Sequence, residues 1–420
     1  MRKTSFWAGS KNPCLLLYNL IVLVIYNLLF FIFALQYGVA RFIFNKPLYG
    51  DYNKENLIKS AYYFLFGRKY KCYFYLHYLM RYPTLKLHFF RMKYMNNPFF
   101  QFRGNVYNKE DLGEDKRLFI TYHFLGFFTF DLREIAEHDR VCVVLGEKSF
   151  VSEGRGREEA DEFCTKCFHY GSFFRENPKQ AIYLRSNDPL LYLKLSREMS
   201  RGSLVIMAYD VFDQWYKKKE ALKKDTDERK SFVYRYKGEN IIYMPSLLIK
   251  LMEKKKVKLV PVITRLAFGG FTKVKYGQVI SYNQSGVFEE EGQRICNQLY
   301  DFLVENIRES PITYGGMEGL GAFMKENIAK PNKPVRAIDV CHEDYKLSTE
   351  IVINRLGKKK YLVTSLRPFF AFTVKKEGLA IIRLLKKGSR LKVNKNNEKQ
   401  VKKLLSVLHQ HGILEIRGCS

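Results

Sequence analysis

The sequence predicts an α/β protein in which helices flank a mixed sheet, with one membrane helix before this domain and a small winged-helix-like domain after it. Three observations carry this prediction. They are an uncharged apolar stretch near the N-terminus, short apolar runs that alternate with helical patterns in the middle, and a hairpin pattern followed by two amphipathic helices at the end. At 420 residues the chain is long enough for a large domain, an anchor and an appended module.

The N-terminal stretch has no charged side chain from Pro13 to Ala40, and its centre is aliphatic and aromatic apart from Asn19 and Asn27. About 20 residues cross one bilayer, and an amide costs less to bury than a charge, so we expect a membrane helix. A buried core helix of a soluble protein is the alternative. A cleaved signal peptide fits less well, because the apolar part exceeds the usual ~7–15 residues. Basic residues flank both ends, which leaves the orientation open.

The middle of the chain alternates strand-like and helical segments, as is typical of a sheet buried on both faces. We expect strands at residues 118–122, 141–145, 181–184, 204–208 and 258–263, with strand-like segments near Val274 and Val279. We expect helices with aromatic faces from 51 to about 110, and further helices at 128–137, 158–170, 190–199, 245–254 and 289–307. Residues 215–231 form a charge-rich insertion.

The most informative residue is His123, where the apolar run from Phe119 to Tyr122 stops. An imidazole moves protons near neutral pH, and ligands of such folds gather at strand ends. Asp131 lies in the helical stretch that follows, and Asp210 lies at the end of a later strand. The pattern indicates a site for acyl-transfer chemistry, with a core histidine bonded to the backbone as the alternative.

The C-terminal part follows a linker at residues 331–349. Residues 361–363 and 369–372 predict a hairpin, and 377–387 and 398–411 predict helices that end at Gly388 and Gly412. These elements indicate a winged-helix-like module over residues 350–420, after an anchor over 1–50 and a central domain over 51–330.

Composition constrains the partners. The chain has 71 basic and 42 acidic side chains, a formal charge of +29, which attracts anionic lipid, nucleic acid or an acidic carrier protein. Aromatic residues crowd beside basic ones between residues 62 and 102, which suits either the lipid headgroup zone or a helical core.

The eight dispersed cysteines predict reduced thiols on the cytoplasmic side. Cys164 and Cys167 are half of a zinc site, so we expect no metal.

Several patterns occur in one order along the chain. Residues 122–128 read Tyr-His-Phe-Leu-Gly-Phe-Phe, residues 202–210 form a Gly-led strand that ends in aspartate, residues 232–238 form an aromatic-Gly turn, and residues 310–318 close on a Pro-x-x-aromatic segment. In this order they resemble the lipid A biosynthesis (HtrB-type) acyltransferases of the lysophospholipid acyltransferase superfamily, over residues 10 to 325. The resemblance implies a glycerolipid-acyltransferase-like fold on the cytoplasmic side of the inner membrane, in a single-pass or monotopic protein. The implied reaction moves a fatty acyl group from an acyl-carrier-protein or CoA thioester to a hydroxyl or amine, with no bound cofactor.

The resemblance also implies residue roles, with His123 as general base. The family has a carboxylate five residues after the histidine, where this chain has Phe128, so Asp131 is the nearest acid that could complete the dyad. Substrate binding is implied for Lys166 first and Arg157 second, with an ordinary surface role as the alternative for either, and for Gly126 beside the histidine. Asp210 would orient the acceptor or brace a loop.

The tail, from Glu350 to Ile416, is similar to PqqD-like winged-helix modules that bind leader peptides, which implies that the acceptor could be a peptide. Two alternatives remain. Phe128 suggests an inactive scaffold that binds a peptide or lipid, and the basic charge with the tail module suggests a nucleic-acid-binding membrane protein. We regard nucleic acid as the less favoured partner, because the second helix of the tail carries Lys399, Lys402 and Lys403 but no Arg or Asn suited to base edges.

Overall fold

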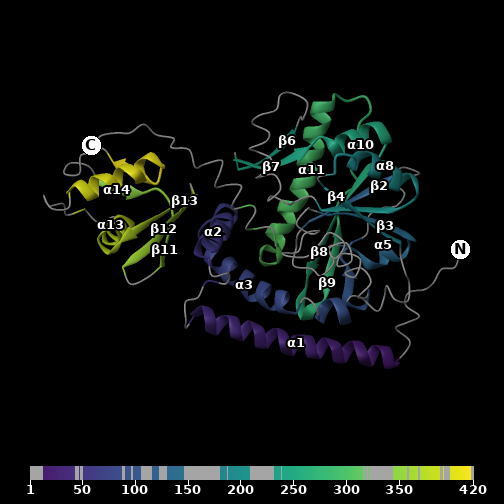
Figure 1. Cartoon of the computed structure of the whole chain (residues 1–420), viewed down its shortest axis with the longest axis horizontal. Coiled ribbons are helices and arrows are strands. Elements are labelled where there is room, and N and C mark those ends of the chain that lie inside the picture. The colour runs from purple at the N-terminus through teal and green to yellow at the C-terminus, as the bar shows by residue number, and fades with distance from the viewer. Residues whose placement is uncertain are drawn as a thin grey trace. The chain divides into compact units, whose positions relative to one another are not determined.

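The structure is a computed structural model, and it divides into two compact units (Figure 1). Unit 1 comprises Met1–Phe44 with Leu76–Gly316, and unit 2 comprises Asn45–Tyr75 with Met317–Ser420. The residues that the structure describes are 13–42, 47, 51–87, 90–95, 98–105, 116–122, 130–145, 180–186, 188–208, 231–237, 239–315, 317, 320, 344–356, 359–367, 369–387, 391 and 398–417. Each unit is described by itself.

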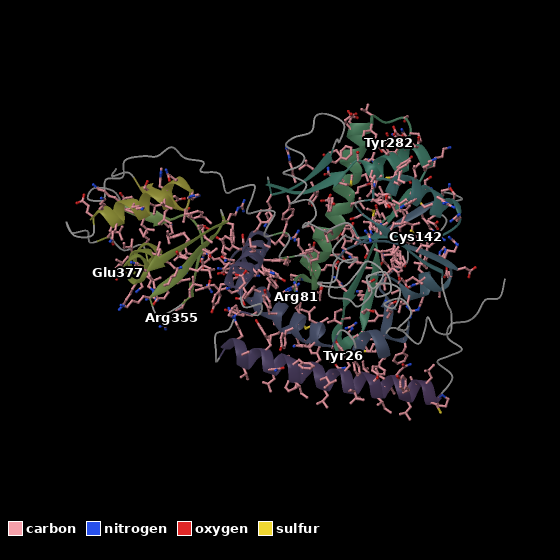
Figure 2. All side chains as sticks on the ribbon, in the orientation of Figure 1. Tyr26, Arg81, Cys142, Tyr282, Arg355 and Glu377 are labelled. Carbon is pink, nitrogen blue, oxygen red and sulfur yellow. The ribbon has the colours of Figure 1, made fainter. Side chains whose placement is uncertain are left out.

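Unit 1 begins with the predicted apolar helix, α1 (Pro13–Phe42), which is long and apolar enough to cross a membrane. Only 17% of the most apolar 18-residue stretch of α1 is buried, so α1 is not an enclosed core helix. One face packs on the rest of unit 1: Tyr26, labelled in Figure 2, is 1% exposed and lies in a cluster with Leu87, Met95 and Phe100. The helix that we expected is therefore present, with one packed face and one open face.

A seven-stranded mixed sheet forms the centre of unit 1, as predicted. Its strands, in spatial order, are β1 (Gln101–Arg103), β9 (Thr272–Tyr276), β8 (Lys258–Leu266), β2 (Arg117–Thr121), β5 (Leu204–Ala208), β3 (Arg140–Leu145) and β4 (Gln180–Arg185). From β8 to β4 neighbouring strands are parallel, while β9 runs antiparallel to β8 and parallel to β1. The short apolar runs of these strands fit a sheet covered on both faces. The strand β2 lies between two parallel neighbours, β8 and β5.

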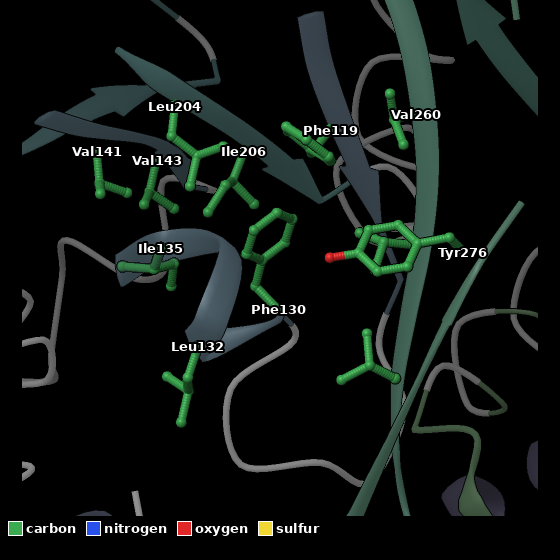
Figure 3. Packing of buried hydrophobic residues seen from close by; sticks show 12 residues of the cluster. Phe119, Phe130, Leu132, Ile135, Val141, Val143, Leu204, Ile206, Val260 and Tyr276 are labelled. Carbon is green, nitrogen blue, oxygen red and sulfur yellow. The ribbon is translucent and has the colours of Figure 1, made fainter. Parts of the chain in front are cut away.

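Helices cover both faces of the sheet. On one face α5 (Leu132–Ala136) packs Leu132 and Ile135 over Phe119, Val141 and Ile206 (Figure 3). The other face carries α8 (Leu191–Ser200), α10 (Leu247–Lys255) and α11 (Phe288–Glu309). Tyr122 points to this second face, because its hydroxyl donates to the backbone oxygen of Leu299 in α11 at 2.9 Å. The hairpin of β6 (Ser231–Tyr236) and β7 (Glu239–Pro245) packs against α11.

Some elements differ from the sequence prediction. Residues 101–103 lie in the region expected to be helical but form the edge strand β1, because they pair with residues 272–274 of β9, which are distant in the sequence. The helix expected from residue 128 begins, within the described residues, only at Leu132, because the Asp131 side chain accepts from the backbone N–H of Arg133 and caps it. Residues near Val279 form one isolated bridge, Leu259 with Ile280, rather than a strand. The expected helix at 158–170, and all of the insertion before Ser231, lie outside the described residues.

The unit 1 part of α3 (Tyr70–Lys86) contains a fully buried histidine, His77. Its Nδ1 lies 3.0 Å from the backbone oxygen of Ile312, and its Nε2 lies 3.4 Å from Arg81 Nη1. A proton on Nδ1 satisfies both contacts, because Nδ1–H then donates and Nε2 accepts. Burial, and secondarily the Arg81 charge, lowers the pKa of His77 to about 3. The ring is therefore neutral at physiological pH.

This histidine makes stability depend on pH. Its folded pKa lies below its unfolded value of about 6.5, so unfolding takes up a proton at acid pH, and stability is lost as the pH falls from about 6.5 toward 3. Moving from about pH 7.5 to about pH 5 should lower the free energy of unfolding by about 2 kcal/mol through this residue. Urea unfolding in detergent at both pH values measures the difference. The variant His77→Gln should show a smaller pH-dependent drop, and an equal drop in both proteins would contradict the assignment.

Unit 2 contains the hairpin and both helices that the tail sequence predicts. The strands β11 (Ile351–Arg355), β12 (Lys360–Leu366) and β13 (Phe369–Lys375) form an antiparallel sheet, β10 (Asp344–Leu347) pairs with β14 (Leu414–Arg417), and the helices are α13 (Lys376–Lys387) and α14 (Glu398–Gln410). Gly412 ends α14 as expected, with a positive φ of +65°. Its N–H donates to the carbonyl oxygen of His409 at 2.9 Å, and the N–H of Ile413 donates to the carbonyl oxygen of Leu408 at 2.8 Å. Gly388 lies outside the described residues.

The boundaries of unit 2 differ from the expected ones. The strand β10 lies within the expected linker at 331–349, and the helix α2 (Tyr52–Phe66), which was expected in the central domain, packs on β12 within unit 2. The Asn56 side chain donates to Thr364 Oγ1 at 2.8 Å and to Asn354 Oδ1 at 3.0 Å, and Ser60 Oγ donates to the Leu366 carbonyl oxygen at 2.6 Å. These buried hydrogen bonds explain why residues near 55 group with the C-terminal part of the chain.

Candidate active site

The carboxyl end of β2 adjoins a buried polar cluster in unit 1. Thr121, the last residue of β2, pairs with Val262 in β8, and Val262 pairs with Tyr276 in β9. Tyr276 is therefore level with the end of β2. Asp131, at the start of α5, is completely buried and accepts a hydrogen bond from the Tyr276 hydroxyl at 3.0 Å. The acid that the sequence nominated thus lies at the strand end after which Tyr122 and His123 follow in sequence.

Three donors hold the Asp131 carboxylate. Its Oδ1 accepts from the backbone N–H of Arg133 at 3.0 Å, and its Oδ2 accepts from Arg103 Nε at 2.5 Å as well as from Tyr276. Burial raises the pKa of Tyr276 far above its usual range, and the charge of Asp131 raises it further, so the phenol stays protonated and donates. Burial lowers the pKa of Arg103, but the carboxylate outweighs this effect and the net pKa is raised. Asp131 and Arg103 therefore form a charge-assisted pair on a rigid support.

Gln101 ties α5 to the edge of the sheet. Its Oε1 accepts from the Leu132 N–H at 2.9 Å, and its Nε2 donates to the Phe130 carbonyl oxygen at 3.0 Å. Arg133 Nη2 returns a bond to the Gln101 backbone oxygen at 2.7 Å. The first N–H groups of a helix have no partner inside the helix, and here the side chains of Asp131 and Gln101 supply two of these partners. The N-terminus of α5 is consequently fixed beside β1.

Two buried polar atoms of this region have no hydrogen-bond partner within the part of the chain that the structure describes: Arg103 Nη2 and Thr264 Oγ1. Both residues lie on one register row, because Arg103 pairs with Val274 and Val274 pairs with Thr264. Side chains alternate along a strand, so Thr264 projects on the same face as Val262, which is the face that α5 covers. This row lies two residues from Tyr276 along β9 and two residues past Val262 along β8, which places it beyond the end of β2.

Buried polar groups without a partner are rare, because each costs about 1–3 kcal/mol. Within the described residues, a guanidinium N–H and a threonine hydroxyl at this strand end therefore have unused capacity to donate hydrogen bonds. Both are hydrogen-bond donors, so an oxygen atom that carries or develops negative charge fits them best. This row and the Asp131 cluster together form the candidate site.

Of the nominated site residues, the structure describes only Asp131. His123, Gly126, Arg157, Lys166 and Asp210 lie outside the described residues, as does Phe128. Arg103, Tyr276 and Thr264 were not predicted from the sequence. One signal was present: in Phe100-Gln101-Phe102-Arg103, aromatic and polar residues alternate with the period of a strand. We had instead assigned that run to the headgroup zone or a helical core.

Cysteines and other side chains that can bind metal also occur in the described part of the chain. No three His, Cys, Asp or Glu side chains come together there in a way that could hold an ion, and the pair Cys164 and Cys167 lies outside it. Burial raises the pKa of both the Cys142 and the Cys296 thiols to about 12. These two thiols remain protonated at neutral pH and are poor nucleophiles.

Unit 2 has a separate, positively charged pocket with a volume of about 590 Å³. The cations that line it are Arg68, Lys71, Lys346, Lys386 and Lys387. One acid, Glu350, also lines it, and its carboxylate lies 3.4 Å from both the Lys71 and the Lys386 Nζ atoms. One carboxylate offsets only part of this charge, so the pocket suits an anionic group.

No protein-family model matches this chain, and no curated protein matches it either.

Proposed function

We propose that this protein is a membrane-associated acyltransferase that moves a fatty acyl group from an acyl-carrier-protein or CoA thioester onto a hydroxyl or amine of a lipid or peptide. The observation that carries the proposal is the Asp131 cluster at the carboxyl end of β2, with two donors, Arg103 Nη2 and Thr264 Oγ1, that have no partner among the described residues. A proton-accepting histidine follows that strand in the sequence, and an apolar helix belongs to the same unit.

In the proposed reaction the acceptor oxygen or nitrogen attacks the thioester carbonyl carbon, and His123 takes its proton. The tetrahedral intermediate then collapses, the carbon–sulfur bond breaks, and the thiolate leaves with the proton from the imidazolium. A carboxylate beside the other ring nitrogen would hold the tautomer and support the positive charge, which is the role proposed for Asp131. The unpaired N–H of Arg103 and hydroxyl of Thr264 are suitable donors for the developing oxyanion.

The remaining roles rest on the resemblance. Lys166, with Arg157 behind it, would contact the donor carbonyl or an acceptor phosphate, Gly126 would let substrate approach the histidine, and Asp210 would orient the acceptor. A charge of +29 favours an acidic carrier protein and anionic lipid as partners. We place the enzyme at the inner membrane with its catalytic domain on the cytoplasmic side.

The test uses the full chain in nanodiscs with acyl-carrier-protein and CoA thioesters of several chain lengths. Release of free thiol is followed over time, and lipids and added peptides are analysed by mass spectrometry. We expect thioester consumption coupled to a product heavier by one acyl unit. If folded protein consumes no donor above the uncatalysed hydrolysis rate, the inactive-scaffold alternative replaces the proposal.

A peptide acceptor is favoured by the basic pocket of unit 2. Reversing two of its charges in the double variant Lys386→Glu, Lys387→Glu should weaken the binding of an acidic fluorescent peptide at least tenfold, because each reversal turns an attraction into a repulsion. Lys402→Glu is the matched control, since Lys402 pairs with Glu398 on α14 outside the pocket. Equal binding by all three proteins would exclude the pocket. Preferential, salt-sensitive binding of duplex DNA would instead favour the nucleic-acid alternative.

A further inference from the structure

We propose that α1 lies in the plane of one membrane leaflet and does not cross the bilayer, so that both ends of α1 and the whole of unit 1 are on the same side. The inference rests on the membrane association of the proposed function but not on its acyl-transfer chemistry. It concerns which surface of unit 1 meets lipid.

The packed face of α1 extends along almost the whole helix. Asn19, Val22, Tyr26, Tyr37 and Arg41 are all at most 7% exposed, and they recur at helical spacing along one side. From Asn19 to Arg41 the helix rises about 33 Å, which exceeds the ~30 Å hydrocarbon thickness of a bilayer. No stretch of α1 long enough to span a membrane is therefore free of packing. If the helix crossed the bilayer, its packing partners would have to enter the hydrocarbon with it.

Those partners are polar or irregular. Arg91, 2% exposed, donates from Nη1 to the Tyr26 hydroxyl at 3.2 Å, and its guanidinium lies 5.4 Å from the centre of the same ring. The Asn27 amide donates at 3.0 Å to the Gly269 backbone oxygen, in the turn η7 (Phe268–Gly270) between β8 and β9. This turn is closely seated on α1, since a Cβ on Gly270 would lie 2.5 Å from the Tyr26 ring.

A spanning α1 would place these groups in hydrocarbon. An irregular turn between two strands has backbone groups that lipid cannot satisfy, and such segments do not occur where lipid contacts them. Near the other end of α1, the Tyr37 ring lies 5.6 Å from Tyr82, and the exposed Lys86 amine lies 5.6 Å from Tyr82 in turn. An exposed amine at hydrocarbon depth is costly. The packed face of α1 thus requires water or protein, not lipid, around its partners.

The opposite face of α1 is apolar and open. Leu17, Val24, Leu28, Phe31 and Leu35 are 59% to 68% exposed and follow one another at three-, four- and seven-residue intervals. Figure 2 shows side chains projecting along the open side of the whole helix. Monomeric soluble proteins rarely expose so long an apolar strip.

The occupant that fits this strip is the acyl-chain region of one leaflet. The exposed strip has no polar side chain in need of a partner, and an apolar helix lying in the interface is buried about 5–10 Å deep. The net charge of +29 would hold such a helix against anionic headgroups. A second copy of the chain, packed strip to strip, is the competing occupant and is an outcome of the test below.

The test measures depth and sidedness in liposomes of phosphatidylethanolamine and phosphatidylglycerol, without an activity readout. Spin labels on single cysteines at Leu17, Leu28 and Leu35 should report one shallow depth, whereas a spanning helix places Leu28 much deeper than the other two. In intact spheroplasts, Ser10→Cys and Lys254→Cys should both stay at the labelling level of the parent chain with an impermeant maleimide, and after permeabilisation both should react above it. Opposite accessibility, unequal depths, or labels shielded from lipid in a dimer would each overturn the proposal. The acyl-transfer assay can fail without changing any of these readouts.

Discussion

Replacing His123 with alanine is expected to lower the rate of thioester consumption by about 10²–10⁴-fold, the range that a positioned general base contributes. The residue follows a strand whose end adjoins the buried Asp131 carboxylate and two donors without a partner among the described residues, so the proposed chemistry depends on a base at this position. The measurement is the initial rate of free thiol release in nanodiscs, with product mass recorded in parallel. The free energy of unfolding should change little, which separates a chemical role from a structural one.

His138→Gln is the matched control for this variant. His138 lies at the amino end of β2, where its Nε2 is 3.6 Å from Glu134 Oε1 and 3.3 Å from Arg117 Nη2. It is a partly buried histidine at the opposite end of the same strand and should retain the parent rate. If His123→Ala consumes thioester as fast as the parent chain, the catalytic proposal is excluded. If both variants lose activity together, the effect is structural.

The architecture of unit 1 follows largely from local patterns. The apolar runs at residues 118–122, 141–145 and 204–208 match β2, β3 and β5 to within one residue. A strand that is covered on both faces has apolar residues at successive positions, and these runs show that pattern. The pattern at 289–307 lies in α11, whose apolar residues recur every three or four positions. In these segments local sequence and tertiary packing demand the same structure.

The predictions failed where packing between distant segments decides the outcome. Nothing near Asn56 in the sequence shows that its amide meets Thr364, three hundred residues later, so the place of α2 in unit 2 was missed. Arg103, Asp131 and Tyr276 come from three separate segments, and only the register of β1, β9 and β8 brings them together. Of the candidate site, only Asp131 was predicted from the sequence, and the other members became apparent from the pairing of the strands.

Replacing Asp131 with asparagine is expected to lower the free energy of unfolding of unit 1 by about 3 kcal/mol. The amide is close in size to the carboxylate and can still cap α5, so the change mainly removes the negative charge. The Arg103 guanidinium then loses its carboxylate at a site where its side chain is 23% exposed. Removing one partner of a buried ion pair costs about 3–5 kcal/mol, and the residual exposure of Arg103 places this pair at the lower end. Chemical unfolding in detergent at neutral pH measures the loss.

Asp188→Asn is the control, because Asp188 also caps a backbone N–H, that of Leu190 at 2.8 Å, and pairs with a cation, Lys194, but at the surface of unit 1. Its replacement should leave the stability nearly unchanged, since exposed ion pairs contribute little. A loss equal to that of Asp131→Asn would show that the buried cluster has no special energetic weight.

The double variant Asp131→Asn, Arg103→Met separates the structural role of this cluster from its chemical one. It removes both charges of the pair, so no guanidinium is left without its carboxylate, and most of the lost stability should return. The rate of thioester consumption should stay low, because the acid proposed to support His123 and the unpaired donor proposed for the oxyanion are then both missing. Recovery of stability and rate together would mean that Asp131 and Arg103 only brace α5 against the sheet. In that case another acid, outside this cluster, would have to support the histidine.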